Sequence, residues 1–432
     1  MTSCRGGFFA RFPATNNCNA RELPDMALHV AKRVWRIKEM MRKEGLWATL
    51  RAVVLRLRNG PGQYADVLKH YEFALPYELP AAAGSPHVGS LLWFIPDFNV
   101  GSGGHLNIFR TIWHLEQMGY ASSIVIGNPV MHHNASEARD AIRQHFFPLQ
   151  AQVLLGQESL PPCEFAIATG WDTAYTVRAF QGAQHKLYFV QDYEPHFYPV
   201  GTESVFAQNT YHFGFFGITA GGWLAAKLAD EYSMATHPVG FGVELDRYRR
   251  LPRREPEVRR VFFYARPPTP RRAFELGLLV LNAVWERMPD TQFVLAGWDT
   301  AGYRIPFPHL ACGTVALDDL PDLYSQCDVA LVLSLTNASL LPLELMACGC
   351  TVVSNRGANV EWLLNEDIAT LADASPEALA DAVCALLADD NRRNELSVRA
   401  ESFARAQTWD IVAKEFESAL RDVRARAQKG SA

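Results

Sequence analysis

Short apolar segments alternate with longer amphipathic segments from about residue 88 to the end of the chain. The apolar segments are typical of buried strands, and the segments between them carry apolar residues at helical spacing. Strands are predicted at 91–95, 122–127, 152–155, 164–168, 186–190, 215–219, 260–265, 292–296, 329–333 and 351–354, and helices at 376–389 and 409–423. Because such alternation is typical of parallel sheets covered by helices, an α/β fold is expected.

The same pattern divides the chain into four parts. Residues 86–240 form a first α/β unit, and residues 241–408 form a second unit with the same plan. Residues 238–244 contain two glycines and are interpreted as the linker between the units. Residues 409–432 hold a terminal helix, and residues 1–85 precede the alternating pattern as an extension. A chain of 432 residues is long enough for two domains with separate cores.

Residues 27–58 of the extension are strongly basic. They contain nine lysines or arginines and two glutamates, whereas the whole chain has a formal net charge of −5. Apolar residues recur at helical spacing on both sides of Gly45, so two amphipathic helices are predicted. Such helices can lie on an anionic membrane surface or pack on the acidic remainder of the chain. Nucleic acid is not expected as a partner, because no recognised binding module is present.

The composition predicts a globular protein of a reducing compartment. Hydrophobic residues make up 49% of the chain and charged residues 20%. The eight cysteines show no disulfide framework and the thirteen histidines show no ligand spacing, so no metal site is expected. No apolar run reaches the length of a membrane span, and residues 1–25 lack a signal-peptide core and are interpreted as disordered. These features predict a cytoplasmic location.

The segment 334–354 predicts a polar loop, a short helix and a strand. Pro342 suits the first turn of a helix, Gly349 suits its end, and the apolar residues 351–353 suit a strand. Glu344 then falls in the first turn, beside backbone N–H groups that have no partner within the helix. Such an end attracts anions, and the carboxylate of Glu344 suits sugar hydroxyls.

Two other loops that follow predicted strands have ligand-binding chemistry. Arg266 directly follows a strand, and Arg271 lies five residues later. The planar guanidinium of arginine gives paired, charge-assisted hydrogen bonds to a diphosphate. Gly103 and Gly104 lie in an earlier loop, where the absence of a Cβ atom lets a ligand approach the backbone. These residues predict a phosphate-binding site.

Three carboxylates also lie where predicted strands end. Asp192 and Glu194 follow the strand 186–190 in an aromatic stretch, and Asp172 follows the strand 164–168. Ligands of open α/β sheets gather at the carboxyl ends of the strands. Asp192 is therefore the first candidate for a general base, with Glu194 or Asp172 as support.

Taken together, these motifs resemble the retaining nucleotide-sugar glycosyltransferases of the GT-B fold that carry the E-x7-E signature. Glu344 matches the second glutamate of that signature, whereas Thr336 stands where the first is expected. The two loop arginines keep the family's spacing, and Thr169 stands where the family has a histidine. The stretch 187–199 is similar to a rhamnosyltransferase branch that builds bacterial surface polysaccharides such as O-antigen.

The resemblance implies two Rossmann-like domains that face a cleft, with the terminal helix crossing back to the first domain. The second domain would bind a nucleotide-sugar donor, best specified as dTDP-rhamnose, and the first would bind a glycan or lipid-linked glycan acceptor. Transfer would retain the anomeric configuration and need no metal or other cofactor. The basic segment 27–58, outside the resemblance, leaves open a peripheral contact with the inner face of the cytoplasmic membrane. The implied donor-binding residues are Gly103, Gly104, Arg266, Arg271, Asn337, Ser339, Leu340 and Glu344, and the implied catalytic residues are Asp192, Glu194 and Asp172.

Two alternatives of other classes stay open at this point. The chain could be a non-catalytic partner that binds a nucleotide-sugar or a glycan, because Thr336 and Thr169 replace residues of the family pattern. It could also be an enzyme of the same fold with other chemistry, such as a sugar-nucleotide epimerase. Consumption of a donor in the presence of an acceptor separates these alternatives.

Overall fold

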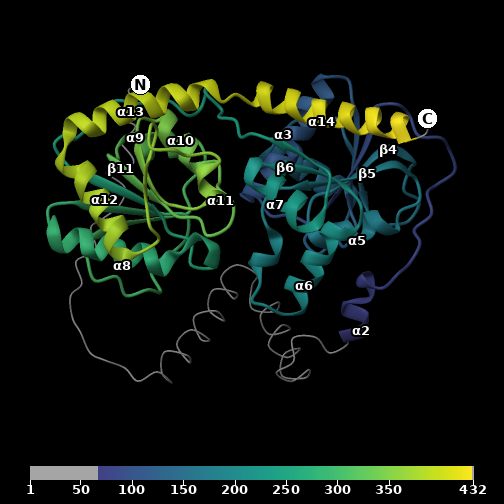
Figure 1. Ribbon diagram of the computed structural model, residues 1–432, viewed down its shortest axis with the longest axis horizontal. Coiled ribbons are helices and arrows are strands. Elements are labelled where there is room, and N and C mark those ends of the chain that lie inside the picture. Colours follow the sequence, from purple (N-terminus) through teal and green to yellow (C-terminus); the bar gives the residue numbers. More distant parts are fainter. Residues whose placement is uncertain (1–66, 431–432) are drawn as a thin grey trace, which may run out of the picture.

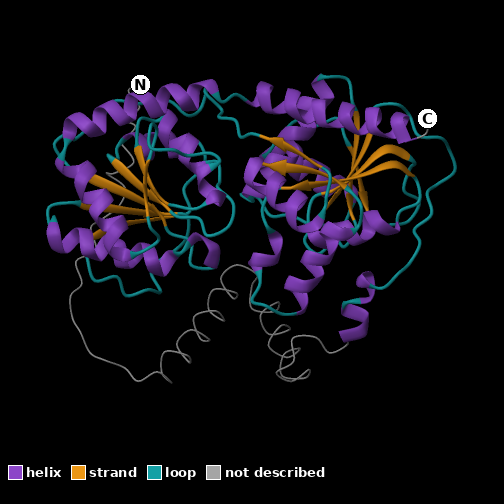
Figure 2. Ribbon diagram, viewed as in Figure 1, coloured by secondary structure: helices purple, strands orange, loops and turns teal. Residues whose placement is uncertain are grey.

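The computed structural model describes residues 67–430 as two lobes that lie side by side (Figure 1). In each lobe, helices flank an inner layer of strands (Figure 2). The predictions for residues 1–25 and 27–58 lie outside the described residues.

The first lobe is built on a seven-stranded sheet in which every pairing is parallel, with strand order β3-β2-β1-β4-β5-β6-β7. The strands are β1 (Ser90–Ile95), β2 (Ala121–Ile126), β3 (Gln152–Leu155), β4 (Cys163–Ala168), β5 (Ala183–Val190), β6 (Phe216–Ala220) and β7 (Thr236–Val239). The central strands pair in register, with Trp93 of β1 opposite Ile124 and Ile167, and all three side chains are fully buried. The apolar pattern predicts these strands except β7, which the sequence assigned in part to the linker.

Helices cover both faces of this sheet and fill the connections between its strands. They are α2 (Val67–His70), η2 (Glu72–Ala74), α3 (Gly103–Gln117), α4 (Ala135–His145), α5 (Trp171–Ala179), η3 (Glu194–Phe197), α6 (Thr202–Asn209), η4 (Thr210–His212) and α7 (Gly222–Tyr232). Asn134 caps α4, because its side chain accepts a hydrogen bond from the N–H of Glu137. Ile108, Ile112 and Leu115 of α3 are buried in the core, as their helical spacing predicts.

The second lobe repeats the plan with a six-stranded parallel sheet in the order β10-β9-β8-β11-β12-β13. Its strands are β8 (Arg260–Tyr264), β9 (Gln292–Ala296), β10 (His309–Gly313), β11 (Val329–Val332), β12 (Thr351–Asn355) and β13 (Thr370–Ala372). Its helices are η5 (Pro270–Arg272), α8 (Phe274–Arg287), α9 (Leu320–Ser325), α10 (Leu341–Ala347), α11 (Ala358–Glu361), α12 (Pro376–Ala388) and α13 (Asp390–Ala406). The two parallel sheets confirm the predicted fold class.

Helix α10 has the local structure that the sequence predicts. Pro342 and Glu344 lie in its first turn, and Gly349 ends it with a φ of +81°, a conformation that favours glycine. A Cβ atom at position 349 would also lie 2.3 Å from Nε of Arg250, so a side chain there would require the Arg250 guanidinium to shift. Strand β12 begins two residues later.

Helix α14 (Trp409–Gly430) returns from the second lobe and packs on the first (Figure 1). Its buried residues belong to the same core as β1, and the ring centroids of Phe416 and Trp93 lie 5.6 Å apart. Beside it, Val243 of the linker donates its N–H to the carbonyl of Gln407, so both connections between the lobes run side by side. None of the helices within residues 67–430 is long and apolar enough to cross a membrane.

Candidate functional site

The two sheets meet at the carboxyl ends of their strands, where Asn337 joins the lobes. This residue lies in the loop after β11 and is 0% exposed. Its Nδ2 atom donates to the carbonyls of Gln191 (3.0 Å) and Ala220 (2.8 Å), which lie at the ends of β5 and β6. Its Oδ1 atom accepts a hydrogen bond from Nε1 of Trp362 at 2.7 Å. The Asn337 side chain, predicted to bind a donor, thus joins the lobes through Nδ2 and is held within its own lobe by Trp362.

Asp192 makes a second set of side-chain contacts between the lobes. Its side chain extends from the loop after β5 and is 8% exposed. Oδ2 accepts a hydrogen bond from Oγ1 of Thr336 at 2.9 Å, and Oδ1 accepts one from the N–H of Asn337 at 2.8 Å. Nε of Arg271 lies 3.3 Å from Oδ2. Thr336, at the position where the sequence resemblance leads one to expect a glutamate, thus has a carboxylate beside it that the first lobe supplies.

Three arginines from the loop after β8 gather at this junction. Nε of Arg266 donates to Oγ1 of Thr269 at 3.1 Å, and Nη1 of Arg272 donates to Oγ of Ser334 at 2.8 Å. Burial lowers the pKa of Arg272, although Asp192 has the opposite effect. Among the described residues, Asp192 is the only carboxylate that forms an ion pair with any of the three arginines. The junction therefore has excess positive charge and favours an anion.

Arg272 was not among the predicted donor residues, although the adjacent pair Arg271 and Arg272 could have suggested it. Which of two neighbouring arginines reaches the opposite loop depends on the η5 turn. That turn ends at Ala273, which has a φ of +50°. The sequence does not specify this conformation, because Ala seldom adopts positive φ.

Glu344 lies at the end of a second polar cluster, between α10, the linker and α3. Burial raises the pKa of Glu344 to about 7, against the effects of Arg110 and of a hydrogen bond with Tyr248. Arg110 forms an ion pair with Glu244, and its guanidinium carbon lies 4.2 Å from the ring centroid of Trp409. Arg110 is buried on α3, and the prediction missed it. In the sequence, Arg110 could have been noticed as an arginine within an otherwise apolar helix segment.

The glycine-rich loop after β1 borders the same junction. Gly103 and Gly104 begin α3, and Nε2 of Gln191 donates to the carbonyl of Gly104 at 3.2 Å. A Cβ atom at Gly103 would have no neighbour within 4 Å, so a ligand has room beside this backbone. His105 lies in the first turn with burial lowering its pKa, so this ring is neutral at neutral pH.

Glu194 and Asp172 lie close to Asp192 in the first lobe, and the hydrogen bonds of Glu194 are made within that lobe. Glu194 is 6% exposed and accepts hydrogen bonds from the hydroxyl of Tyr188 (2.8 Å) and the N–H of Trp171 (2.7 Å). Burial raises the pKa of Glu194 to about 8, so this carboxyl is protonated at neutral pH. Asp172 lies in the first turn of α5, where part of the residue is exposed but burial of the carboxyl raises its pKa. Asp192 is thus the carboxylate of the three that faces the arginines.

The remaining predicted residues have less specific surroundings. Ser339 and Leu340 are partly buried and directly precede α10, and their role in binding a phosphate stays a prediction. Thr169, which replaces a family histidine, donates its hydroxyl to the carbonyl of Phe94 at 2.9 Å. Within the part of the chain that the structure describes, no three His, Cys, Asp or Glu side chains are placed to hold a metal ion.

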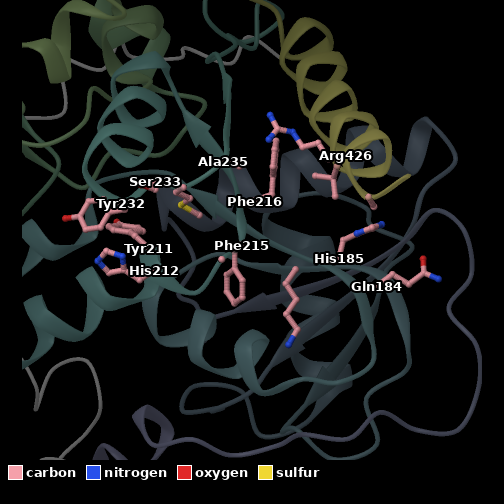
Figure 3. A pocket seen from close by; sticks show the side chains of 15 residues that line it. Gln184, His185, Tyr211, His212, Phe215, Phe216, Tyr232, Ser233, Ala235 and Arg426 are labelled. Carbon is pink, nitrogen blue, oxygen red and sulfur yellow. The ribbon is translucent and has the colours of Figure 1, made fainter. Parts of the chain in front are cut away.

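A cavity of about 540 Å³ lies at the amino ends of the strands of the first sheet, opposite the junction between the lobes (Figure 3). It is lined by residues at the amino ends of β5 and β6, by the end of α7 and by Arg426 of α14. Phe215, Phe216 and Tyr232 form its buried apolar wall. Because the carboxyl ends of parallel strands all lie on the side opposite to their amino ends, this cavity is separate from the junction with the arginines.

Comparison with known proteins identifies relatives of both lobes. Residues 259–384 match the family model described as WsaF, C-terminal domain. The chain is 33% identical over 347 residues to the O-antigen biosynthesis protein RfbC of Myxococcus xanthus, a match that covers 78% of this chain and 27% of that protein. It is 36% identical over 113 residues to the D-inositol 3-phosphate glycosyltransferase of Xylanimonas cellulosilytica, with 26% of each covered. The chain thus spans about a quarter of the length of these relatives.

Solved structures share the fold at low sequence identity. Sucrose-phosphate synthase from Thermosynechococcus elongatus has a TM-score of 0.61 and 14% identity, covering 78% of this chain and 99% of that chain. HepE of Anabaena in complex with UDP has a TM-score of 0.60 and 14% identity, covering 77% and 100%. Together with the two parallel sheets, these likenesses establish the GT-B fold.

Proposed function

We propose that the chain is a glycosyltransferase that moves a sugar from a nucleotide-sugar to a glycan or lipid-linked glycan in the synthesis of a bacterial surface polysaccharide. The observation that carries this proposal is the gathering of Arg266, Arg271 and Arg272 where the two lobes meet, with one carboxylate among them. The identity to an O-antigen biosynthesis protein supports the polysaccharide assignment. A structural neighbour that contains UDP supports a nucleotide donor.

The arginines would bind the diphosphate of the donor. Negative charge builds on the diphosphate as the bond between the anomeric carbon and its oxygen breaks. Fixed cations at the place where charge develops stabilise that state most when water is excluded. Arg266 has no carboxylate partner within residues 67–430 and Arg272 is buried, so both can supply such a field without a metal ion.

The neighbouring groups would position the rest of the donor. Glu344 would bind a ribose or deoxyribose hydroxyl, because it lies in the first turn of α10 beside Arg110 and Tyr248. The open backbone at Gly103 would face the phosphates from the other lobe. The similarity of residues 187–199 to the rhamnosyltransferase branch supports dTDP-rhamnose as the donor and retention of configuration.

Asp192 would deprotonate or orient the acceptor hydroxyl. It is the carboxylate nearest to the arginines, and Tyr193 and Asn337 fix its position by donating backbone N–H groups at 2.8 Å. Glu194 would support it from the first lobe as a protonated carboxyl, and Asp172 would contribute from the start of α5.

A second candidate function is a binding protein without catalysis. Thr336 and Thr169 use their hydroxyls in structural hydrogen bonds, so neither supplies the acid or imidazole chemistry of the residue that it replaces. In this candidate the arginines would still bind a nucleotide-sugar, and the lobes would report its presence by closing.

The experiment that tests the proposal combines thermal shift with product analysis. Full-length protein is first screened against UDP-, dTDP-, GDP- and ADP-sugars, because a ligand of the folded state raises the melting temperature. The donor that binds is then incubated with lipid-linked glycan acceptors. Release of nucleoside diphosphate together with a new glycosidic bond establishes the transferase. Binding without turnover favours the binding protein, and nucleotide release without a new bond favours hydrolysis or an epimerase.

A further inference from the structure

Arg271 is held between two groups of the first lobe. Its Nε atom lies 3.3 Å from Oδ2 of Asp192, and its guanidinium carbon lies 4.0 Å from the ring centroid of Phe197. Its backbone carbonyl accepts a hydrogen bond from the N–H of Leu335 at 2.9 Å, which fixes the residue to its own lobe. A cation predicted to bind the donor phosphates therefore already faces an anion.

The contact between Arg271 and Asp192 is an ion pair without hydrogen-bond alignment. Nε of Arg271 is buried and has no hydrogen-bond partner. The carboxylate of Asp192, by contrast, accepts aligned hydrogen bonds from Thr336 and Asn337. A buried donor without an aligned acceptor is costly, so Arg271 gains by exchanging Asp192 for a better-placed anion. Asp192 retains its hydrogen bonds after such an exchange.

We propose that Asp192 substitutes for a donor phosphate as the anionic partner of Arg271, so that a nucleoside diphosphate must draw the Arg271 guanidinium away from Asp192 in order to bind. The inference rests on the proposed function, because it concerns the same donor site. A phosphate can meet the guanidinium with two parallel hydrogen bonds and carries more charge than a carboxylate, so it competes successfully. Asp192 thus affects donor affinity through Arg271, in addition to its proposed role toward the acceptor hydroxyl.

The loss of Arg271 as a partner prepares Asp192 for chemistry, while Asp192 itself stays in place. The hydrogen bonds from Thr336 and Asn337 keep the carboxylate in place, while loss of Arg271 removes its compensating charge. The proton of the acceptor hydroxyl then passes to Oδ2 of Asp192 as the acceptor oxygen bonds to the anomeric carbon. The bond from that carbon to the diphosphate oxygen breaks, and its electron pair leaves with the diphosphate. Donor therefore binds before acceptor.

Two substitutions separate the charge of Asp192 from its structural role. Asp192→Asn removes the charge but leaves Oδ1 to accept from the N–H groups of Tyr193 and Asn337. The hydroxyl of Thr336 can rotate to accept from the new amide, so the junction keeps its hydrogen bonds. Thr336→Val removes one hydrogen bond to Asp192 and leaves the charge, so it reports loosened packing alone.

Calorimetric titration of the full-length chain with UDP, dTDP, GDP and ADP measures the effect. For each diphosphate that binds the wild type, Asp192→Asn should bind about threefold to tenfold more tightly, as expected for a partly exposed ion pair. The gain should vanish in the Asp192→Asn/Arg271→Ala double variant. Asp322→Asn is the matched control. Asp322 lies on α9 and pairs with Arg254, which is not one of the three site arginines. This variant should bind as the wild type does.

Several outcomes would overturn the inference. The first is that Asp192→Asn binds nucleoside diphosphate no more tightly than the wild type does. The second is that Asp192→Asn tightens binding equally when Arg271 is replaced by Ala. The third is that Thr336→Val tightens binding as much as Asp192→Asn does. Melting curves show whether each variant is folded, and Asp192→Ser, which also removes the charge, repeats the comparison if Asp192→Asn is not. A wild type that binds none of the four diphosphates would contradict the proposed function itself, and the inference with it.

Discussion

At the scale of single residues, the balance between Asp192 and the arginines beside it decides what the junction binds. Arg271 pairs with Asp192, and Arg272 is affected by the charges of Asp192, Arg271 and Arg266. Arg266 and Arg272 have neutral partners, the hydroxyls of Thr269 and Ser334. Charge-assisted hydrogen bonds to a phosphate are therefore available there once a ligand arrives. The side chains already lie in place, so a ligand does not have to order them.

Arg266→Ala and Arg271→Ala should each weaken the binding of donor and of nucleoside diphosphate about tenfold to hundredfold. A lost hydrogen bond to a charged group is worth roughly 1.5–3 kcal/mol. Calorimetry on the folded variants measures this. The matched control is Arg399→Ala on α13, where the guanidinium donates to the carbonyl of Asp367 outside the site. Wild-type affinity in both site variants would remove these arginines from the donor site.

Glu194→Gln should flatten the dependence of stability on pH. Burial raises the pKa of Glu194 from its ordinary value of 4.5 to about 8 in the folded protein. Between these values the unfolded chain loses the proton and the folded chain keeps it, so stability is greatest at low pH and falls as pH rises through the window. The neutral amide removes this loss, which is on the order of a few kcal/mol. Urea unfolding at pH 5 and pH 8 measures it, and an equal loss in both proteins would place the proton elsewhere.

Single-residue chemistry identified candidates in the sequence but not their partners. The arginines after β8 and the glutamate in the first turn of α10 follow from local spacing. The hydrogen bond between Thr336 and Asp192 joins residues 144 positions apart, and no local pattern specifies such a contact. For the same reason the sequence assigns Asn337 to a ligand, whereas its side chain binds the other lobe.

At the scale of elements, the three strands that the sequence missed all lie at sheet edges, whereas every inner strand and the edge strand β3 were predicted. Inner strands of a parallel sheet are buried on both faces and form continuous apolar runs. β7 contains Pro238, which an edge strand tolerates because one side of its backbone has no partner. β10 and β13 are also edge strands, and β13 has three residues, too few for a pattern.

The linker between the lobes depends on close contact with α14. A Cβ atom on Gly242 would lie 2.6 Å from the backbone nitrogen of Trp409, so Gly242→Ala should destabilise the protein by about 1–3 kcal/mol. Gly222→Ala at the start of α7 is the control, because a Cβ atom there would meet nothing within 4 Å. Thermal unfolding compares the two. Equal melting temperatures for the two variants would contradict this prediction, because they would show that the linker can move away from the start of α14 at no cost in stability.

At the scale of the whole molecule, the lobes are held together by a few buried polar contacts beside the two chain connections. The comparisons establish the GT-B fold, which was expected from the resemblance of the loop motifs, whereas the alternation of strands and helices predicts only parallel sheets covered by helices. The sequence does not predict how far the lobes close, because this depends on contacts such as those of Asn337 with Gln191 and Ala220.

Asn337→Ala should allow the lobes to move apart. The change leaves the carbonyls of Gln191 and Ala220 and the indole N–H of Trp362 without their partner, at a cost of about 1–3 kcal/mol for each group that stays buried. Exposure of these groups to water relieves the cost. Small-angle X-ray scattering should therefore give a larger radius of gyration than for the wild type. Asn282→Ala, on the surface of α8, is the control, and equal radii for all three proteins would contradict this role.

The central proposal is that arginines at the junction bind a nucleotide-sugar whose sugar is then transferred. Proton NMR of the full-length chain with a bound donor and a lipid-linked glycan acceptor tests this most directly, with Arg266→Ala and Arg271→Ala measured in parallel. We expect nucleoside diphosphate and a new anomeric signal to appear in equal amounts, with the configuration of the donor, and to appear far more slowly in both variants. Turnover at the wild-type rate in both variants, or no transfer with any donor that binds, would contradict it.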